Sequence, residues 1–374
     1  ILYSHSSTLN GPATPSSLQL LETYRRFTQS YMSRLAKSLL SLSVAFFTCM
    51  LWSGGPDRTA PRWALVTPAE TSEMTQPGRE VNTGRPKKTG AESGGDEERQ
   101  RTLRWEAEQR RRKTTLRQAC REWSPKAREY LPRSMTDMSF LLVDDRHKAL
   151  YCFVPKVSCT AWKSIWMILT GMTTIKNPLD IKKFVPHLLH NKMMLVKQPY
   201  NVSVLQNKLN TYTKLLIVRD PYERLLSAYR NKLEHGKNHT FWGQYVNNII
   251  KYNKKHGMGA NTEVTFTAFV NYVNGFSKPH LNEHWRPYHQ LCFPCAIKYD
   301  VIAKYETLAD DSERFLRLIG APDYLHYPPF VPSKTASLLP QYMANLSQAQ
   351  RHDLYQVYRR DFEAFEYQPF GGLV

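Results

Sequence analysis

From about residue 140 onward, short apolar runs alternate with segments whose apolar residues recur at helical spacing. Residues 140–143 and 149–154 are apolar and flank a polar Asp-Asp-Arg-His-Lys stretch, which predicts a β-hairpin. Residues 215–218 form a continuous apolar run, as expected of a buried strand in a parallel sheet. Helices are predicted at 267–273, 313–319 and 349–361. The alternation predicts one α/β domain over residues 136–374, with a central parallel sheet flanked by helices.

The segment 151–169 divides into a strand, a loop and a helix. Residues 151–154 suit a buried strand, Pro155 ends its ladder pairing, and apolar residues follow at helical spacing over 162–169. Lys156 therefore lies in a loop before a helix N-terminus, where free backbone N–H groups bind phosphate or sulfate. The loop is not a Walker loop, because the pattern G-x-x-x-x-G-K-[ST] is absent. The alternative is a lysine that is only solvated.

A second loop follows the strand predicted at 215–218. Asp220 is predicted as the N-cap of the next helix, with Pro221 at its first position and Glu223 completing a capping box. Arg219 stands at the carboxyl end of the strand, where ligands bind in open α/β sheets.

Ser227 lies two turns into that second helix, so Arg219 and Ser227 are predicted to meet one phosphate group. The alternative is a surface ion-pair network of Arg219, Asp220 and Arg224 around a capped helix.

These two segments resemble those of the Golgi carbohydrate sulfotransferases that use 3′-phosphoadenosine 5′-phosphosulfate. In that family P-K-V-x-C-T-N-W-K binds the 5′ phosphosulfate and R-[DE]-P-[FY]-E-R-L-x-S-A binds the 3′ phosphate. By position, the first role falls on Pro155, Lys156, Val157, Ser158, Cys159, Thr160 and Ala161. The second falls on Arg219, Asp220, Pro221, Tyr222, Glu223, Arg224, Leu225, Leu226 and Ser227.

A third stretch is similar to the branch that contains the chondroitin and dermatan 4-O-sulfotransferases. It comprises Asn-Glu-His-Trp at 282–285, Leu-Cys-Phe-Pro-Cys at 291–295, and the shorter matches at 299–300 and 304–308. The resemblance extends from about residue 140 to about residue 367.

The resemblance implies a P-loop-like sulfotransferase domain that needs the phosphosulfate donor and no metal. It implies transfer of sulfonate to a glycan hydroxyl, first of all position 4 of N-acetylgalactosamine in chondroitin or dermatan, with a glycosaminoglycan as partner. One alternative is a sulfotransferase for terminal N-acetylgalactosamine or glucuronic acid of glycoprotein glycans. Another is a non-catalytic glycan-binding protein of the same fold.

Two residues depart from the family pattern. Ala161 stands where Asn is usual, and Ser158 stands where Ala or Gly is usual. If that Asn contacts the donor, its loss removes a hydrogen bond to a charged group, a change of about 1.5–3 kcal/mol. Such a loss lowers affinity without abolishing it.

Sulfonate transfer also needs a base for the proton of the acceptor hydroxyl, and histidine suits this role near neutral pH. His187 and His190 lie between the two segments, in a region where the resembled family carries a histidine. We expect one of them to act with Lys156 in catalysis. Glu283 and His284 are rival candidates.

The formal charge of +19 on 374 residues predicts attraction to a polyanion or an acidic membrane surface. Part of the excess lies at 99–121, which predicts an exposed basic helix, either a solvated stem or an acceptor-binding arm. No nucleic-acid-reading motif is present, so nucleic acid is not predicted as a partner. Other lysines that would follow an anionic glycan are Lys176, Lys182, Lys183, Lys192 and Lys197.

The N-terminal third predicts a location. Residues 39–52 are mostly apolar and follow several basic residues, which predicts a signal-anchor transmembrane helix at 38–53 with residues 1–37 in the cytosol. With the resemblance, this gives a single-pass type II Golgi membrane protein. The alternative is a cleaved signal peptide, because fourteen residues are few for a span. Met32 begins a conventional n-region, so residues 1–31 are interpreted as a mis-assigned extension.

Residues 54–135 are predicted to form a lumenal stem that includes the basic helix. The five cysteines beyond Cys49 allow at most two disulfides and one free thiol, with the pairing open. Cys292 and Cys295 have zinc-ligand spacing, but a second C-x-x-C is missing, so zinc is only an alternative. Glycosylation sequons occur at Asn201, Asn238 and Asn345.

Overall fold

A computed structural model describes residues 92–123, 138–234, 240–258, 263–275, 281–330 and 333–372. The chain divides into the units Ile1–Arg85 and Pro86–Val374, and all described residues belong to the second. The predicted cytosolic tail, the anchor at 38–53, the stem residues 54–91 and 124–135, and Asn238 lie outside the described residues. Within the described ranges, no helix has the length and apolar character needed to cross a bilayer.

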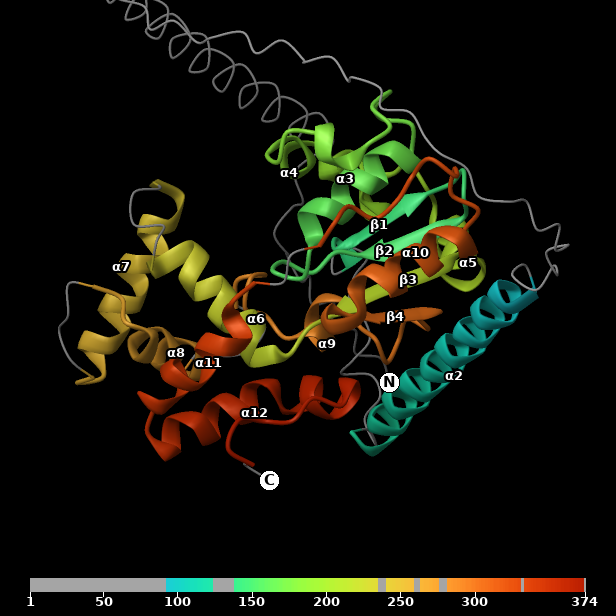
Figure 1. Cartoon of the computed structure of the whole chain (residues 1–374). Coiled ribbons are helices and arrows are strands. Elements are labelled where there is room, and N and C mark those ends of the chain that lie inside the picture. The colour runs from blue at the N-terminus through green and yellow to red at the C-terminus, as the bar shows by residue number, and fades with distance from the viewer. Residues whose placement is uncertain are drawn as a thin grey trace, which may run out of the picture. The chain divides into compact units, whose positions relative to one another are not determined.

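The described strands form one four-stranded sheet in the order β1-β2-β3-β4 (Figure 1). Strands β1 (Leu141–Asp144) and β2 (Ala149–Cys152) pair antiparallel and confirm the predicted hairpin. Strand β3 (Thr213–Val218) runs parallel to β2 and to β4 (Val301–Lys304). The sheet is therefore mostly parallel, and the predicted α/β class is confirmed.

The register places the carboxyl ends of the parallel strands at one edge. Tyr151 of β2 pairs with Leu215 of β3, and Val218 at the end of β3 pairs with Lys304 at the end of β4. The residues after each strand therefore emerge together, at the edge where open α/β sheets bind ligands.

The helices agree with the periodic patterns. Helices α8 and α12 contain the predicted ranges, and α10 overlaps 313–319 but begins earlier, at Leu308. The helices are α2 (Glu92–Glu122), α3 (Cys159–Leu169), α4 (Val185–Leu189), α5 (Val202–Thr211), α6 (Pro221–Tyr229), α7 (Thr240–Lys255), α8 (Phe266–Gly275), α9 (Tyr288–Leu291), α10 (Leu308–Leu318), α11 (Thr335–Ala344) and α12 (Gln348–Phe365). Short 3₁₀ segments lie at Pro178–Asp180, His190–Met193, Leu195–Lys197 and Tyr305–Thr307, and a π-helical turn lies at Arg230–Glu234.

Two hydrophobic clusters stabilise this unit. One surrounds the sheet and includes the fully buried Trp162 and Trp166 of α3. The other joins α6, α7, α8 and α12, with Trp285 buried among them. Figure 1 shows the second group of helices beside the sheet. Helix α6 directly follows β3 in the chain but packs in the second cluster, so the turn at its start joins the two cores.

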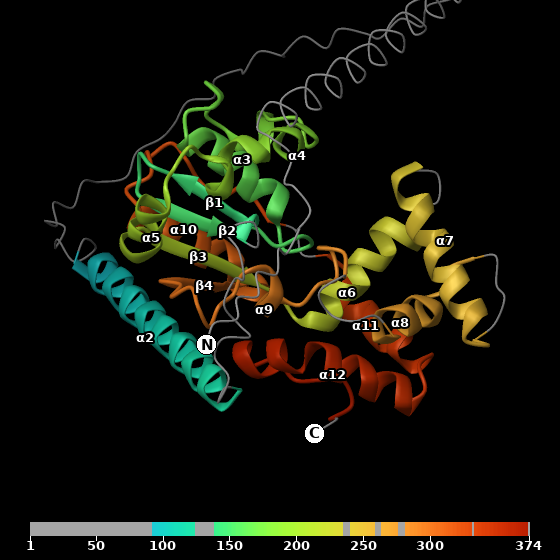
Figure 2. The same cartoon turned by 180° about the vertical axis from the view of Figure 1, so that it is seen from behind.

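Helix α2 runs along β4, as Figures 1 and 2 both show. The side chain of Gln109 accepts the N–H of Ile302 at 2.9 Å and donates to the Ile302 carbonyl at 3.2 Å. Arg112 pairs with Asp311 at 2.8 Å, and both side chains are buried. The expectation of an exposed helix is therefore wrong for one face, because polar groups of that face satisfy the open edge of the sheet.

Two disulfides are formed among the described cysteines. Cys120 of α2 bonds to Cys295, and Cys152 at the end of β2 bonds to Cys292, while Cys159 is free. The zinc alternative for the Cys292-x-x-Cys295 pair is wrong, because a cysteine in a disulfide has no thiolate to give a metal.

Candidate active site

The loop after β2 has an unusual backbone. Lys156 and Ser158 both have positive φ, at 72° and 57°, although neither is glycine. Ser158 is the N-cap residue of α3 but makes no side-chain cap, because its Oγ lies 2.5 Å from the Tyr327 hydroxyl. The backbone N–H groups of the first turn of α3 therefore stay available, beside the positive end of the helix dipole. This arrangement suits an anion.

The loop after β3 begins α6 as predicted, with one difference. The Asp220 carboxylate accepts the N–H groups of Tyr222 and Glu223, both at 2.9 Å, and Pro221 is the first helical residue. Burial raises the pKa of Asp220 to about 6. Glu223 does not complete a capping box, because its carboxylate accepts a 2.8 Å bond from Arg219 instead.

Arg219 is buried and joins distant parts of the chain. Besides Glu223, its guanidinium donates to the hydroxyls of Ser333, at 2.8 Å, and Thr335. It also stacks 4.0 Å from the centre of the Tyr305 ring. The predicted phosphate-binding arginine thus meets two hydroxyl residues that follow it by more than a hundred positions.

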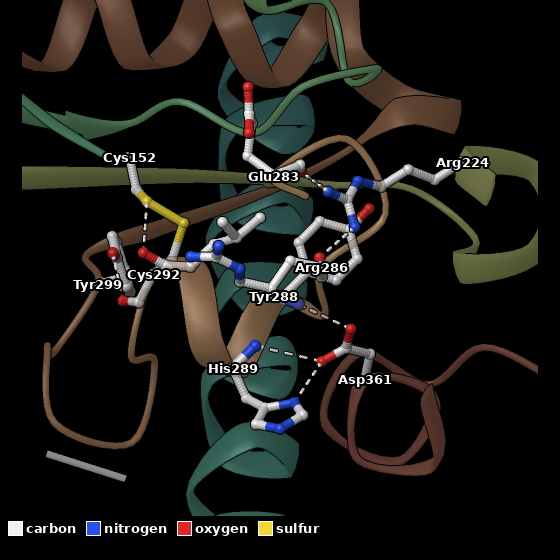
Figure 3. Close-up of a disulfide and its surroundings, with 10 residues drawn as sticks. Cys152, Arg224, Glu283, Arg286, Tyr288, His289, Cys292, Tyr299 and Asp361 are labelled. Carbon is white, nitrogen blue, oxygen red and sulfur yellow. Dashed lines mark hydrogen bonds and ion pairs between the residues drawn. A yellow bond between two sulfur atoms is a disulfide. The ribbon is translucent and has the colours of Figure 1, made fainter. Parts of the chain in front are cut away.

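Arg224 supports the site from behind. Its guanidinium donates to the main-chain carbonyls of Pro155 at 3.0 Å, Glu283 at 2.8 Å and Arg286 at 2.7 Å. Figure 3 shows the last two contacts near the Cys152–Cys292 disulfide. The buried Tyr288 hydroxyl donates to the main-chain carbonyl of Arg219 at 2.9 Å. The same hydroxyl accepts the main-chain N–H of Arg219, also at 2.9 Å. These contacts fix both loops and the 282–288 segment against one another.

A cavity of about 530 Å³ opens between the two loops. Of the residues predicted from the sequence, it is lined by Pro155, Lys156, Ser158, Cys159, Thr160, Ala161, His187, Arg219 and Ser227, and by the rival candidate His284. Further lining residues are Ser164, Pro178, Leu179, Ile181, Lys183, Asn231, Lys232, Tyr305, Pro328, Phe330 and Ser333.

The remaining predicted residues lie outside the cavity wall. Tyr222, Leu225 and Leu226 pack in the second hydrophobic cluster, and Val157 is fully buried in the first. Asp220, Pro221, Glu223 and Arg224 shape the loop instead of lining the cavity. The two described sequon asparagines, Asn201 and Asn345, are exposed.

The cavity concentrates positive charge. Burial, together with the nearby charges of Lys232 and Arg219, lowers the pKa of Lys156 to about 8. Burial also lowers the pKa of Lys232 and lowers to about 8 that of Lys163, which follows the lining residues Thr160 and Ala161 in α3 but is not itself among the lining residues. Within the described part of the chain, no carboxylate forms an ion pair with any of these three lysines. Buried and half-buried lysines without an ion-paired carboxylate fit an anionic ligand such as a nucleotide phosphosulfate.

The three candidate histidines differ in their surroundings. His187 lines the cavity, with Nε2 2.9 Å from the Thr160 hydroxyl, and burial lowers its pKa to about 4. His190 donates from Nδ1 to the His187 carbonyl at 2.7 Å and packs edge-on against Phe153. His190 is not among the described residues that line the cavity. His284 does line it.

Sequence reasoning missed the wall formed by Lys232, Phe330 and Ser333. Lys232 lies in the π-helical turn just after α6, and a basic residue one turn beyond Ser227 was the available signal. Nothing local marked Phe330 or Ser333, because tertiary packing alone brings that segment to Arg219. An α/β sheet with a cationic cavity at its strand ends is typical of enzymes that bind a phosphorylated nucleotide.

Comparison with known proteins identifies the class further. The sequence model of the Sulfotransferase family matches residues 139–368. Carbohydrate sulfotransferase 11 of Rattus norvegicus is 35% identical over 268 residues, which cover 68% of this chain and 75% of the relative. Carbohydrate sulfotransferase 12 of Mus musculus is 35% identical over 254 residues, covering 62% and 60%. Carbohydrate sulfotransferase 8 of Mus musculus is 34% identical over 278 residues, covering 71% and 65%. No solved structure matches.

The chain belongs to the Sulfotransferase family. It is a carbohydrate sulfotransferase that takes sulfonate from 3′-phosphoadenosine 5′-phosphosulfate.

Proposed function

We propose that this enzyme transfers sulfonate to position 4 of N-acetylgalactosamine in chondroitin or dermatan. The observation that carries the proposal is the cavity in which Lys156, Lys232 and Arg219 meet without an ion-paired carboxylate on either lysine. The similarity of residues 282–308 to the chondroitin and dermatan 4-O branch supports the choice of acceptor.

We assign the donor's two anionic ends to the two loops. Lys156, Thr160 and the N–H groups at the start of α3 hold the 5′ phosphosulfate, because they share one wall of the cavity. Arg219, Ser227 and Ser333 hold the 3′ phosphate from the other loop. Arg224 positions both loops without touching the ligand, because main-chain carbonyls occupy its guanidinium.

The chemistry follows from this placement. The acceptor oxygen attacks sulfur, an O–S bond forms, and the bond from sulfur to the bridging phosphate oxygen breaks. Lys156 stabilises the charge that develops on that bridging oxygen. In the proposed mechanism, cationic side chains neutralise the negative charge of the transferred and leaving groups. A histidine of the cavity takes the proton of the acceptor hydroxyl.

The acceptor is expected to approach over the Lys183 side of the cavity. Lys183, Leu179 and Pro178 line the wall contributed by the segment between α3 and α4. Cationic side chains at this wall would attract the uronate carboxylates of the acceptor. The same feature would serve a short glycan that ends in neutral N-acetylgalactosamine less well, because such a glycan lacks the repeated uronate carboxylates of chondroitin and dermatan.

We further propose that the enzyme is a single-pass type II Golgi membrane protein, anchored by residues 38–53 and glycosylated at Asn201, Asn238 and Asn345. The two disulfides support a lumenal location, because such bonds persist in oxidising compartments. Exposure of Asn201 and Asn345 is compatible with carrying a glycan.

An acceptor screen tests the substrate. The 374-residue chain would be incubated with donor and with desulfated chondroitin, desulfated dermatan, or glycans that end in N-acetylgalactosamine or glucuronic acid. We expect 4-O-sulfated N-acetylgalactosamine disaccharides after lyase digestion of the chondroitin or dermatan product. Sulfation of the terminal sugars alone would move the assignment to the glycoprotein alternative. Donor binding with no transfer to any acceptor would favour the non-catalytic alternative. Ala161 is the basis of that alternative, because it stands where the family usually has Asn.

A further inference from the structure

The orientation of His284 is fixed by its neighbours. Its Nδ1 lies 2.7 Å from Oδ1 of Asn282, which also accepts the His284 backbone N–H at 3.0 Å. The amide nitrogen of Asn282 donates to the Tyr245 hydroxyl at 2.9 Å. The opposite amide orientation would place two N–H donors against the His284 N–H, so Oδ1 must face the histidine.

This contact decides which ring nitrogen carries the proton. An amide oxygen can only accept, so Nδ1 of His284 donates, and the neutral imidazole then has its lone pair on Nε2. The ring is held edge-on against Trp242, 5.1 Å between centroids, and the side chain is 17% exposed. His284 therefore presents an unprotonated nitrogen from a fixed position on the cavity wall.

The surrounding charges make that nitrogen responsive to the donor. Burial, together with the nearby charges of Lys232, Lys156, Arg224 and Lys163, lowers the pKa of His284 to about 2. Among the described residues, the one carboxylate paired with the ring is that of Glu283, whose Oε1 lies 3.5 Å from Nδ1 of His284. When phosphate and sulfonate groups neutralise the same lysines, the pKa of His284 rises and Nε2 becomes a stronger base.

His187 is less suited than His284 to accept the proton of the acceptor hydroxyl. Its Nε2 already forms a hydrogen bond with the Thr160 hydroxyl. Lys156 lowers the pKa of His284 but is not among the charges that lower that of His187, so His284 is the histidine more strongly coupled to Lys156.

We propose that His284 is the catalytic base of this enzyme and that Asn282 is the positioning residue that sets its tautomer. This inference rests on the proposed sulfonate transfer. As the acceptor oxygen bonds to sulfur, its proton passes to Nε2 of His284, and the bond from sulfur to the bridging oxygen breaks with its electron pair leaving on adenosine 3′,5′-bisphosphate. The imidazolium later returns the proton to solvent.

The test compares His284→Gln, His284→Ala and His187→Gln in the full chain, with His256→Gln as the matched control on an exposed helix end. Each variant is assayed for kcat, for KM of the acceptor, for affinity to adenosine 3′,5′-bisphosphate, and for slow donor hydrolysis, in which water replaces the acceptor. We expect His284→Gln to lower kcat by about 10²–10⁴-fold, with nucleotide affinity within about threefold of wild type. Added imidazole should restore part of the activity of His284→Ala.

Asn282 provides a readout that loss of folding would not give. Asn282→Ala should lower kcat, whereas Asn282→Asp should restore much of it, because a carboxylate also accepts from Nδ1. Asn282→Asp should also shift the acidic limb of the pH profile upward, because the new negative charge favours the imidazolium.

Two results would overturn the proposal. One is a His284→Gln enzyme that keeps kcat within about threefold of wild type, and the other is a loss in His187→Gln alone, which would move the base to His187. A wild-type protein that binds the nucleotide but neither hydrolyses the donor nor sulfates any acceptor would instead refute the proposed transfer itself. The hydrolysis assay separates a wrong acceptor from a wrong base.

Discussion

At the scale of single residues, Lys156 combines two unfavourable features. A non-glycine residue with φ of 72° is strained, and a half-buried ammonium without a carboxylate partner is costly to desolvate. A strained backbone and an unpaired ammonium can both persist at a ligand site, where the surrounding structure fixes the residue in its binding conformation. Here Arg224 fixes the preceding carbonyl of Pro155, and Cys159 begins the helix that follows.

Lys156→Ala should lower the rate of sulfonate transfer by about 10²–10³-fold, because it removes the cation that stabilises the leaving oxygen. Lys148→Ala is the matched control, since Lys148 also has a positive φ, of 49°, but is exposed in the β1–β2 turn. Transfer rates and thermal unfolding of both variants check this. Equal losses in the two variants would contradict the role of Lys156.

Nucleotide binding should take up protons near pH 8.5. With pKa values of about 8, Lys156 and Lys163 are largely neutral there in the free enzyme, and a bound anion favours their charged forms. Uptake on the order of one proton is expected, and affinity should fall as pH rises above about 8. Calorimetry in buffers of different ionisation enthalpy measures the uptake. An uptake that is as large at pH 6 as at pH 8.5 would refute this explanation, because both lysines are already charged at pH 6.

Local rules predicted some site residues and not others. Asp220 was identified as a cap because an acid, a proline and a helical pattern follow one another in the chain, and the structure confirms it. The same rules predicted that the Glu223 side chain completes the capping box. In the structure the Glu223 carboxylate instead accepts a hydrogen bond from the Arg219 guanidinium, a charged partner. The contacts of Arg219 with Ser333 and Thr335 lie beyond any local rule, because they depend on how the chain folds back.

At the scale of elements, α2 shows where periodicity is a poor guide. Its buried face includes Gln109, Arg112, Leu116 and Ala119, so the stripe is half polar and gives little apolar signal. The hairpin and β3 were predictable because their apolar runs are continuous. The packing of α2 was not, because it depends on hydrogen bonds to the β4 edge and on the Cys120–Cys295 bond.

Arg112→Ala should lower the free energy of unfolding by about 3–5 kcal/mol, because it leaves Asp311 buried without its cation. Arg110→Ala, two residues away, should change it by less than about 1 kcal/mol, since Arg110 pairs with Glu106 at 3.7 Å in solvent. Denaturant unfolding of the two variants provides the comparison. Similar effects would mean that α2 is not held by this buried pair.

At the scale of the whole molecule, the positive net charge of the chain predicts that the KM for an anionic acceptor depends on salt concentration. The formal charge of +19 should favour the approach of a polyanionic chain. Because salt screens such attraction, KM for desulfated chondroitin should rise several-fold between 50 and 300 mM NaCl, on the scale set by a Debye length of about 10 Å at 0.1 M. KM for a neutral N-acetylgalactosamine acceptor should change little. Equal salt dependence for both acceptors would exclude charge steering.

The most direct test of sulfonate transfer at the two-loop cavity uses radiolabelled phosphosulfate donor, desulfated chondroitin, and the wild-type, Lys156→Ala, Arg219→Ala and Lys148→Ala chains. Label should enter the glycan with the wild type and with Lys148→Ala. Both Lys156→Ala and Arg219→Ala should lose transfer, the second through weaker nucleotide binding. Transfer that persists in both variants, or a folded wild type that binds the donor and labels no glycan, would contradict the account.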